Sequence, residues 1–309
     1  MTLDALADAL AARLGPDAVR RDVPVAEFST YRLGGPVDLV VTVGTDAGLA
    51  GVAAALADGA TPVLVLGRGS NLLVADRGFA GLGILLTGDF ETLTMGPDHV
   101  TAGAAVPLPV VARRAAAAGL TGLEFYVGIP GSVGGAVRMN AGGHGRDTAE
   151  VLRHAWTVDL TADPRPRGRD AADLDLRYRH SALVPTEVVT RAQFRASPDT
   201  PAACAARVDE VVRWRREHQP GGANAGSVFR NPPGDSAGRL IDATGLKGLR
   251  VGGAVVSEKH SNFFQAEPGA TADDVAALVG EVQARVGDAT GVRLVPELQL
   301  VGFDDGVRR

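Results

Sequence analysis

The first third of the chain alternates between the helical and the strand spacing of apolar positions. Residues Met1 to Leu14 place charged side chains among apolar ones, as in an amphipathic helix. The apolar runs Val37 to Val43 and Val63 to Leu66 predict buried strands, and the alanine-rich segment Leu49 to Leu56 predicts a helix between them. This alternation is typical of an α/β unit.

The middle of the chain, from Gly67 to about Arg195, consists mainly of glycine-rich turns and short apolar runs. The pattern predicts strands at Gly83 to Leu86, Val100 to Gly103 and Glu187 to Ala196, with one helix near Val110 to Ala118. We find no internal repeat and no low-complexity linker, so the parts are expected to pack together.

The last third mixes both patterns again. A helix through Val208 to Arg216 is expected to stop before the Pro-Gly-Gly sequence at Pro220, and a short helix is expected near Ala237 to Ala243. Thr271, followed closely by two aspartates, predicts the start of a helix that runs to about Val286. A final strand is expected from Val292 to Val301.

Composition and charge exclude several classes of protein. The chain has 309 residues, enough for two or three subdomains, and its 45% hydrophobic and 22% charged residues are a globular balance. A net charge of -5 and a pI of about 5.7 argue against nucleic-acid and anionic-membrane partners. The single cysteine, Cys204, excludes an internal disulfide and fits a reducing compartment. With no signal peptide or membrane-spanning stretch in the sequence, we expect a soluble, cytoplasmic protein.

The first of two glycine-rich loops, Gly67-Arg68-Gly69-Ser70-Asn71, follows a predicted strand as a dinucleotide-binding turn would. A Rossmann site needs a helix after the glycines, whereas the sequence here continues as an extended apolar run. Successive backbone N–H groups can bind a diphosphate without a helix. A phosphate-binding loop and a plain tight turn therefore both remain open.

The second loop joins two glycine-dense turns, Gly128 to Ala136 and Asn140 to Gly145, with Ser132 and Asn140 as side-chain partners. This exceeds what a hairpin requires, and each glycine costs roughly 0.5–1 kcal/mol of chain entropy in regular structure. A large flat cofactor with a pyrophosphate, bound against the backbone, would offset that cost.

The second half of the chain places polar side chains between apolar flanks at four points. Arg179 lies in a polar cluster, and Ser227 follows a glycine turn. Ser257 to Asn262 are a continuous run of polar residues, and Glu297 interrupts an apolar strand. Taken alone, each has a structural explanation as an ion-pair partner, a turn residue or an outward-facing side chain. Their combination with the two glycine loops favours a functional interpretation.

In this order, the motifs resemble UDP-N-acetylenolpyruvoylglucosamine reductase, the MurB family of peptidoglycan precursor synthesis, over nearly the whole chain. The resemblance is carried by Phe28 to Gly35, Gly67 to Leu73, Gly128 to Ala136, Tyr178 to Ser181, Ala225 to Phe229 and Pro296-Glu297.

The resemblance implies an α+β protein, with a two-domain FAD-binding fold of the vanillyl-alcohol-oxidase (PCMH) type and a third α/β substrate-binding domain. Residues 1–66 and 67–205 would hold the cofactor and residues 206–301 the substrate, with 302–309 returning to the first domain. The implied activity is that of a UDP-N-acetylmuramate dehydrogenase, an oxidoreductase with non-covalent FAD that uses NADPH to reduce UDP-N-acetylglucosamine enolpyruvate. This is a step of cell wall biogenesis, on which cell shape and division depend. No metal, nucleic acid, membrane or obligate protein partner is implied.

Position by position, the resemblance implies Ser227 as proton donor, Arg179 as catalytic arginine and Glu297 as catalytic glutamate. Residues implied to contact the cofactor are Tyr31, Arg32, Gly67, Gly69, Ser70, Asn71, Gly128, Pro130, Gly131, Ser132, Gly134, Gly135, Asn140, Gly142 and Gly145. Residues implied to contact the substrate are Tyr178, Arg215, His218, Asn231, Lys259 and His260.

Two positions depart from the family pattern, because tyrosine is frequent where this chain has His144 and lysine where it has His218. The short stretch between Arg195 and Arg213 resembles the class that lacks an inserted tyrosine-bearing loop. Three alternatives stand beside this function. One is a flavin-dependent oxidoreductase of the same fold acting on another nucleotide sugar or alcohol, and another is a repurposed or non-catalytic paralogue. The third, a plain nucleotide-binding or interaction module, is disfavoured by the nearly complete set of motifs.

Overall fold

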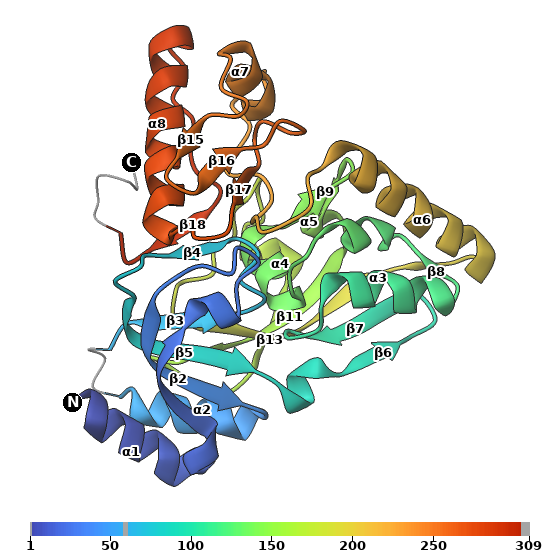
Figure 1. Cartoon of the computed structure of the whole chain (residues 1–309). Helices are drawn as coiled ribbons and strands as arrows, with labels where there is room; N and C mark the ends of the chain where they lie inside the picture. Colours follow the sequence, from blue (N-terminus) through green and yellow to red (C-terminus); the bar gives the residue numbers. More distant parts are fainter. Residues whose placement is uncertain (1, 58–60, 304–309) are drawn as a thin grey trace. The chain divides into compact units, whose positions relative to one another are not determined.

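The computed structural model describes residues 2–57 and 61–303, which fall into two compact units (Figure 1). Unit 1 contains Met1–Arg21, Asp38–Arg68 and Gly81–Arg215, and unit 2 contains Asp22–Val37, Gly69–Ala80 and Arg216–Arg309. Two hydrophobic clusters form the core of unit 1, and a third forms the core of unit 2.

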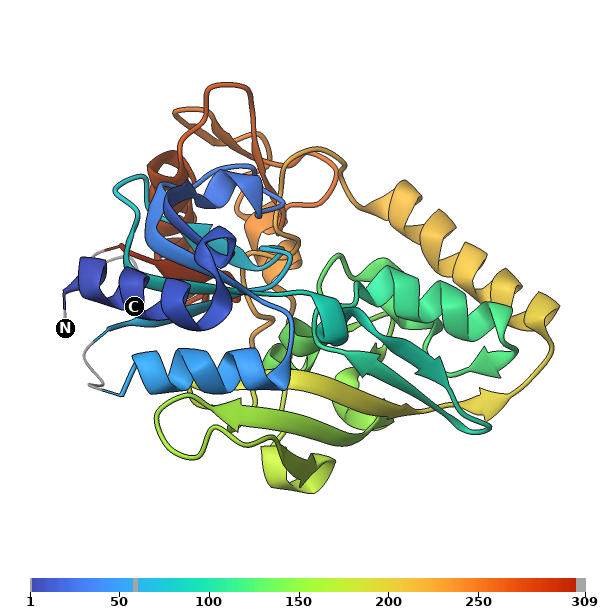
Figure 2. The same cartoon turned by 90° about the horizontal axis from the view of Figure 1, so that it is seen from below.

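The amino-terminal part of the chain forms a four-stranded sheet of order β1-β2-β5-β3, in which β3 and β5 run parallel. Helices α1 and α2 pack against each other and lie side by side in Figure 2, dark blue and lighter blue. Thr2 and Thr45 cap their amino termini with side-chain oxygens, as threonine does at helix starts. The bounds are α1 Leu3–Leu14, β1 Val19–Pro24, β2 Pro36–Val43, α2 Asp46–Ala55, β3 Val63–Leu66 and β5 Phe79–Leu86.

A second, five-stranded sheet of unit 1 has the order β12-β11-β13-β7-β6, and each neighbouring pair is antiparallel. Helices α3 and α4 pack against its strand β7, and α4 also packs against β13 (Figure 1). The bounds are β6 Leu93–Met95, β7 His99–Gly103, α3 Leu108–Ala117, α4 Val133–Met139, β11 Leu152–Asp159, β12 Arg167–Asp170, β13 Glu187–Arg195 and α6 Pro201–His218.

Unit 2 contains a small antiparallel sheet, β15-β16-β17, against which helix α8 packs. Strand β4 pairs in parallel with β18, so two segments far apart in the sequence lie side by side. Asp76, just after β4, accepts hydrogen bonds from Ala272 N at 3.0 Å and Asp273 N at 2.9 Å, and so caps α8 from outside. The bounds are β4 Leu72–Val74, α7 Ala237–Ala243, β15 Arg250–Val251, β16 Ala254–Val256, β17 Phe264–Ala266, α8 Ala272–Thr290 and β18 Gln299–Val301.

Short elements connect these parts. They are η1 Pro16–Ala18, η2 Val25–Glu27, η3 Gly88–Glu91, β8 Leu120–Thr121, η4 Glu124–Gly128, β9 Gly142–Gly143, β10 Arg146–Asp147, α5 Thr148–Val151, η5 Ala171–Leu174 and β14 Ser197–Pro198. No helix within residues 2–57 and 61–303 is both long and apolar enough to cross a membrane.

Three of the predicted elements need correction. The helix before Pro220 begins at Pro201, seven residues before the predicted start at Val208. The predicted strand Val292 to Val301 is regular only in β18, because the residues before it bond to a loop instead. The second glycine loop contains helix α4, which the glycine-rich sequence concealed. The predicted return of residues 302–309 falls largely on 304–309, which lie outside the described residues.

Candidate active site

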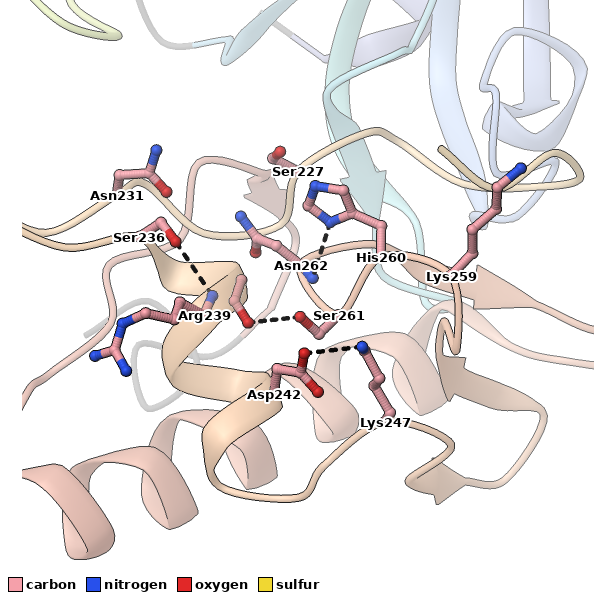
Figure 3. Close-up of a pocket in the computed structure, with 11 residues that line it drawn as sticks. Ser227, Asn231, Ser236, Arg239, Asp242, Lys247, Lys259, His260, Ser261 and Asn262 are labelled. Carbon is pink, nitrogen blue, oxygen red and sulfur yellow. Dashed lines mark hydrogen bonds and ion pairs between the residues drawn. The ribbon is translucent and has the colours of Figure 1, made fainter. Parts of the chain in front are cut away.

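Ser227 lies in a pocket of about 340 Å³ within unit 2 (Figure 3). The pocket also contains Asn231, Lys259 and His260, three residues implied by the family resemblance to contact substrate. The remaining lining residues are Ser236, Gly238, Arg239, Asp242, Lys247, Ser261 and Asn262. The structure therefore brings together residues from four separate segments of the carboxyl-terminal third.

The backbone around Ser227 is bonded on both sides. Ser227 itself forms an antiparallel bridge with Phe263. On the other side, Arg230 N donates to Val295 O at 2.9 Å and Glu297 N donates to Val228 O at 2.7 Å. Ser227 and Glu297 therefore lie on neighbouring segments, although they are 70 positions apart in the sequence.

Asn71, at the end of the first glycine loop, supports Glu297. Its side-chain Nδ2 donates to Glu297 O at 3.0 Å, and its own carbonyl accepts from Gln299 N at 3.0 Å. The family resemblance implies that Asn71 contacts the cofactor. In the structure its amide already fixes the backbone of the implied catalytic glutamate.

Cationic side chains predominate among the charged groups that line the pocket. Arg239, Lys247 and Lys259 line it, against a single carboxylate, Asp242. Lys247 forms an ion pair with Asp242 at 2.8 Å, and Lys259 Nζ donates to Arg216 O at 2.6 Å. Arg239 forms an ion pair with Asp235, which does not line the pocket, so the lining itself carries an excess of positive charge that suits an anionic ligand.

Arg179 lies in unit 1, where carbonyl groups of the second glycine loop hold its guanidinium. Nη2 donates to Gly142 O at 3.1 Å and Nη1 to Asn140 O at 3.5 Å. The guanidinium also lies over the Tyr178 ring, 5.0 Å from its centroid. The second glycine loop thus fixes the position of an arginine from a distant segment.

Asn140 is only 1% exposed and forms a left-handed helix cap with φ of 41°. Its Nδ2 donates to Asp147 Oδ2 at 3.1 Å and Arg177 O at 3.0 Å, while Oδ1 accepts from Ala149 N at 2.8 Å. Protein groups therefore occupy much of the hydrogen-bonding capacity of this amide. Its implied contact with the cofactor stays a prediction.

At two positions, a glycine of the first loop lies too close to another segment of the protein for a side chain to fit. A Cβ on Gly67 would lie 2.9 Å from Ser132 Oγ, so the first loop meets the second within unit 1. A Cβ on Gly69 would lie 2.5 Å from Phe28 O, and Thr30 N donates to Gly69 O at 3.3 Å within unit 2. Thr30 Oγ1 is buried there without a hydrogen-bond partner among the described residues. An unsatisfied buried hydroxyl beside a glycine turn fits a site that a polar ligand completes.

Other residues implied to bind ligands have varied surroundings. Tyr31 lies in the core of unit 2, where burial raises the pKa of its phenol, whereas Arg32 is exposed. In unit 1, His144 packs edge-on against Trp214 with ring centroids 4.8 Å apart, and a Cβ on Gly128 would lie 3.2 Å from Arg215 Cδ. Gly131 is buried, and Gly134 N donates to Ala104 O at 2.9 Å. The residues that are partly or fully exposed are Ser70, Pro130, Gly135, Gly145 and His218.

The sequence-based site omitted several residues that line the pocket. Lys247 lies between Gly245 and Gly248, which both have positive φ. These two glycine turns are a sequence signal from which Lys247 could have been predicted as a pocket residue. Arg239 and Asp242 lie on α7, four and seven residues after Asp235. The sequence of this segment is typical of an ordinary surface helix. Asn262 belongs to the polar run Ser257 to Asn262 but was not predicted as a site residue.

Matches to known families define the class of protein. Residues 37–160 match the family model of an FAD binding domain, and residues 218–301 match the carboxyl-terminal domain of UDP-N-acetylenolpyruvoylglucosamine reductase. The chain is therefore an FAD-binding oxidoreductase.

Individual relatives identify the family. The chain is 44% identical to UDP-N-acetylenolpyruvoylglucosamine reductase of Acidiphilium cryptum over 91% of both sequences, and 40% identical to that of Methylorubrum extorquens over 98% of this chain and 99% of the relative. The crystal structure of the enzyme from Thermus caldophilus superposes with a TM-score of 0.79 at 38% identity, covering 92% of this chain and 99% of that one. The chain belongs to the UDP-N-acetylenolpyruvoylglucosamine reductase (MurB) family, flavin-dependent enzymes of peptidoglycan precursor synthesis. The predicted family and the predicted α+β FAD-binding fold with a further domain are confirmed.

The burial of His260 gives the pocket a testable pH dependence. Burial lowers the pKa of its imidazole below the ordinary value, a hydrogen bond to its own backbone opposes this shift, and the positive charge of Lys247 adds to it. Asn262 N donates to His260 Nδ1 at 3.3 Å, so the neutral ring carries its proton on Nε2. The other charged groups that line the pocket are Arg239, Asp242 and Lys259.

We expect His260 to make the wild type more acid-sensitive than a His260→Gln variant. Because the folded-state pKa lies below the ordinary value of 6.5, the stabilising contribution is complete above pH 6.5 and is lost as pH falls through the folded pKa. Thermal unfolding midpoints of both proteins between about pH 7.5 and about pH 5 measure the difference. Parallel curves would show that His260 protonates freely in the folded protein.

Proposed function

We propose that the chain catalyses the NADPH-dependent, FAD-mediated reduction of UDP-N-acetylglucosamine enolpyruvate to UDP-N-acetylmuramate. One observation carries the proposal: Ser227 and Glu297 are bonded onto neighbouring segments beside a pocket rich in cationic side chains. A nucleotide-sugar diphosphate is an anion of suitable chemistry for that pocket. Domain assignments 1–66 and 67–205 for cofactor and 206–301 for substrate are part of the proposal, as is a cytoplasmic location.

The two glycine loops and the segment around Thr30 are the groups that would hold FAD. In unit 1, Gly67 of the first loop lies against Ser132 of the second loop. In unit 2, Thr30 N donates a hydrogen bond to Gly69 O. The chemistry that FAD supplies when bound is hydride transfer from the reductant to the substrate. The protein's own residues must then bind the substrate and provide the proton.

In the proposed reaction, Ser227 provides that proton. When a hydride adds to the terminal carbon of the enolpyruvyl double bond, an electron pair remains on the neighbouring carbon. The proton of Ser227 Oγ forms the new C–H bond there, and solvent returns a proton to the serine. A hydroxyl is a weak acid, so the transfer requires a strongly basic carbon held close to it.

Arg179 and Glu297 have complementary roles in this proposal. The guanidinium remains charged at all relevant pH values and can bind a carboxylate through two N–H groups, so Arg179 suits the carboxylate on which negative charge builds. The carbonyl groups of Gly142 and Asn140 limit its motion. Glu297 polarises the same group or relays the proton, with its backbone held by Asn71.

In the pocket, Arg239, Lys247 and Lys259 are proposed to bind the diphosphate, with Asn231 and His260 as neutral donors toward the sugar. Asn231 Oδ1 accepts from Ala237 N at 3.1 Å, which orients its side-chain amide at the edge of the pocket. Tyr178, Arg215 and His218 complete the proposed set of substrate contacts.

The visible spectrum of the purified protein tests the proposed function. We expect a yellow protein whose non-covalent flavin is released by acid, bleached by NADPH and restored by UDP-N-acetylglucosamine enolpyruvate. Recolouring by a different nucleotide sugar, but not by this one, would assign the chain to another substrate. A protein that takes up no FAD when offered an excess would contradict the proposal as a whole.

A further inference from the structure

Asn262 is a buried polar side chain for which the reaction above has no task. It is 3% exposed and belongs to the wall of the pocket that contains Ser227 (Figure 3). Its Oδ1 accepts from Phe229 N at 3.0 Å, and its Nδ2 donates to Phe229 O at 2.9 Å. One amide therefore satisfies both backbone groups of a residue two positions after Ser227.

This arrangement imitates a strand neighbour. In an antiparallel pair, two residues exchange both backbone hydrogen bonds, and here the Asn262 side chain supplies the second partner in place of a backbone. Its main chain continues the contact, because Asn262 O accepts from Val228 N at 2.8 Å. Asn262 thus bonds the segment that follows Ser227 at three points, all within unit 2.

The same segment connects the serine to the glutamate. Val228 O accepts from Glu297 N at 2.7 Å, opposite the edge that Asn262 binds. A shift of the Val228 and Phe229 backbone would therefore move Ser227 and Glu297 together. Buried amide hydrogen bonds resist such a shift because breaking one leaves an unpaired group away from water.

We propose that Asn262 is a positioning residue for proton transfer, and that its side chain holds the backbone after Ser227 so that the hydroxyl meets the reacting carbon. The inference rests on the proposed role of Ser227. It assigns no contact between Asn262 and the substrate. The effect of losing the amide should therefore appear in the rate of the protonation step rather than in substrate affinity.

The first test separates the two half-reactions of the FAD-loaded enzyme by stopped-flow absorbance. For Asn262→Ala we expect bleaching by NADPH at the wild-type rate, and recolouring by UDP-N-acetylglucosamine enolpyruvate about 10- to 100-fold slower, as for a misplaced catalytic group. The substrate concentration for half-maximal recolouring should change by no more than about 2-fold, because binding groups remain in place. Val279→Ala, which removes buried volume from α8 at a residue that does not line the pocket, is the control for lost stability and should recolour normally.

A double-mutant cycle with Ser227→Ala decides whether Asn262 acts through the serine. If it does, Ser227→Ala and the double variant should recolour at equal rates within about 2-fold. Multiplication of the two defects, by about 10-fold or more, would overturn the inference, because Asn262 would then act independently of Ser227. Failure of wild-type bleaching or recolouring would instead contradict the proposed function, so the two failures are distinguishable.

Asn262→Asp keeps the inference testable if the alanine variant does not fold. A carboxylate can accept from Phe229 N but cannot donate to Phe229 O, whereas a protonated carboxyl group can do both. Burial favours the neutral form, so recolouring by Asn262→Asp should speed up as pH falls, relative to wild type. A pH profile parallel to that of the wild type would overturn the inference.

Discussion

A Ser227→Ala enzyme should still be bleached by NADPH yet lose turnover by about 100-fold or more, the usual range for removal of a general acid. The reason is that the variant keeps every group proposed to hold cofactor and diphosphate but lacks the Oγ proton. Rapid-mixing absorbance measures the two half-reactions separately. Only the recolouring phase with UDP-N-acetylglucosamine enolpyruvate should slow.

Thr290→Ala provides the control for loss of a hydroxyl group in the same unit. Thr290 Oγ1 donates to Val286 O at 2.7 Å at the end of α8, and Thr290 is not among the residues that line the pocket. This variant should retain both half-reactions. If Ser227→Ala also retained both, the proton would come from another group, and Glu297 would become the first candidate.

Regular elements with local signals could be predicted from the sequence. Helix α7 spans Ala237–Ala243 as expected, and Thr271 caps α8 with Asp274 N donating to its hydroxyl at 3.0 Å. The end of α8 was predicted at Val286 but lies at Thr290, before Gly291 with φ of 72°. Residues that cap or terminate a helix act within a few positions of its end, so they can be recognised in the local sequence.

Long-range pairing could not be predicted in the same way. The segment before β18 has the apolar spacing of a strand, yet Glu297 N and Leu298 N both donate to Val228 O. Nothing near Glu297 in the sequence indicates that partner, because the bond depends on how distant segments pack. The same holds for Asn71, whose amide bonds Glu297 across 226 residues.

The candidate site was predicted in part, and the division has a physical basis. Ser227, Arg179 and Glu297 stood out only through the family motifs, since each alone fits an ordinary surface role. Lys247 and Arg239 escaped notice because cations on surface turns and helices are common. The structure adds what spacing cannot give: these cations line the same pocket as Ser227.

The largest stability effect is expected for Gly35→Ala, in the Phe28 to Gly35 motif. A Cβ on Gly35 would lie 2.2 Å from Asp76 O and 2.7 Å from Gly78 N, and both neighbours are backbone atoms that cannot rotate away. Gly35 N also donates to Ala75 O at 3.1 Å, which holds the two segments together. We expect a loss of about 3 kcal/mol or more in the free energy of unfolding.

Gly280→Ala is the matched control, because it makes the same substitution with the opposite expected sign. Gly280 lies inside α8, and no atom beyond its chain neighbours and the local helix backbone comes within 4 Å of the position of an added Cβ. Alanine should therefore stabilise the protein by about 1 kcal/mol through helix propensity alone. Urea unfolding curves of the two variants measure both effects, and a Gly35→Ala midpoint equal to that of wild type would mean that the Asp76 segment yields freely. A shift of the Asp76 segment would also displace the Asp76 carboxylate, which caps α8 by accepting from Ala272 N and Asp273 N. An unchanged unfolding midpoint of Gly35→Ala would therefore require that this cap contributes little to stability.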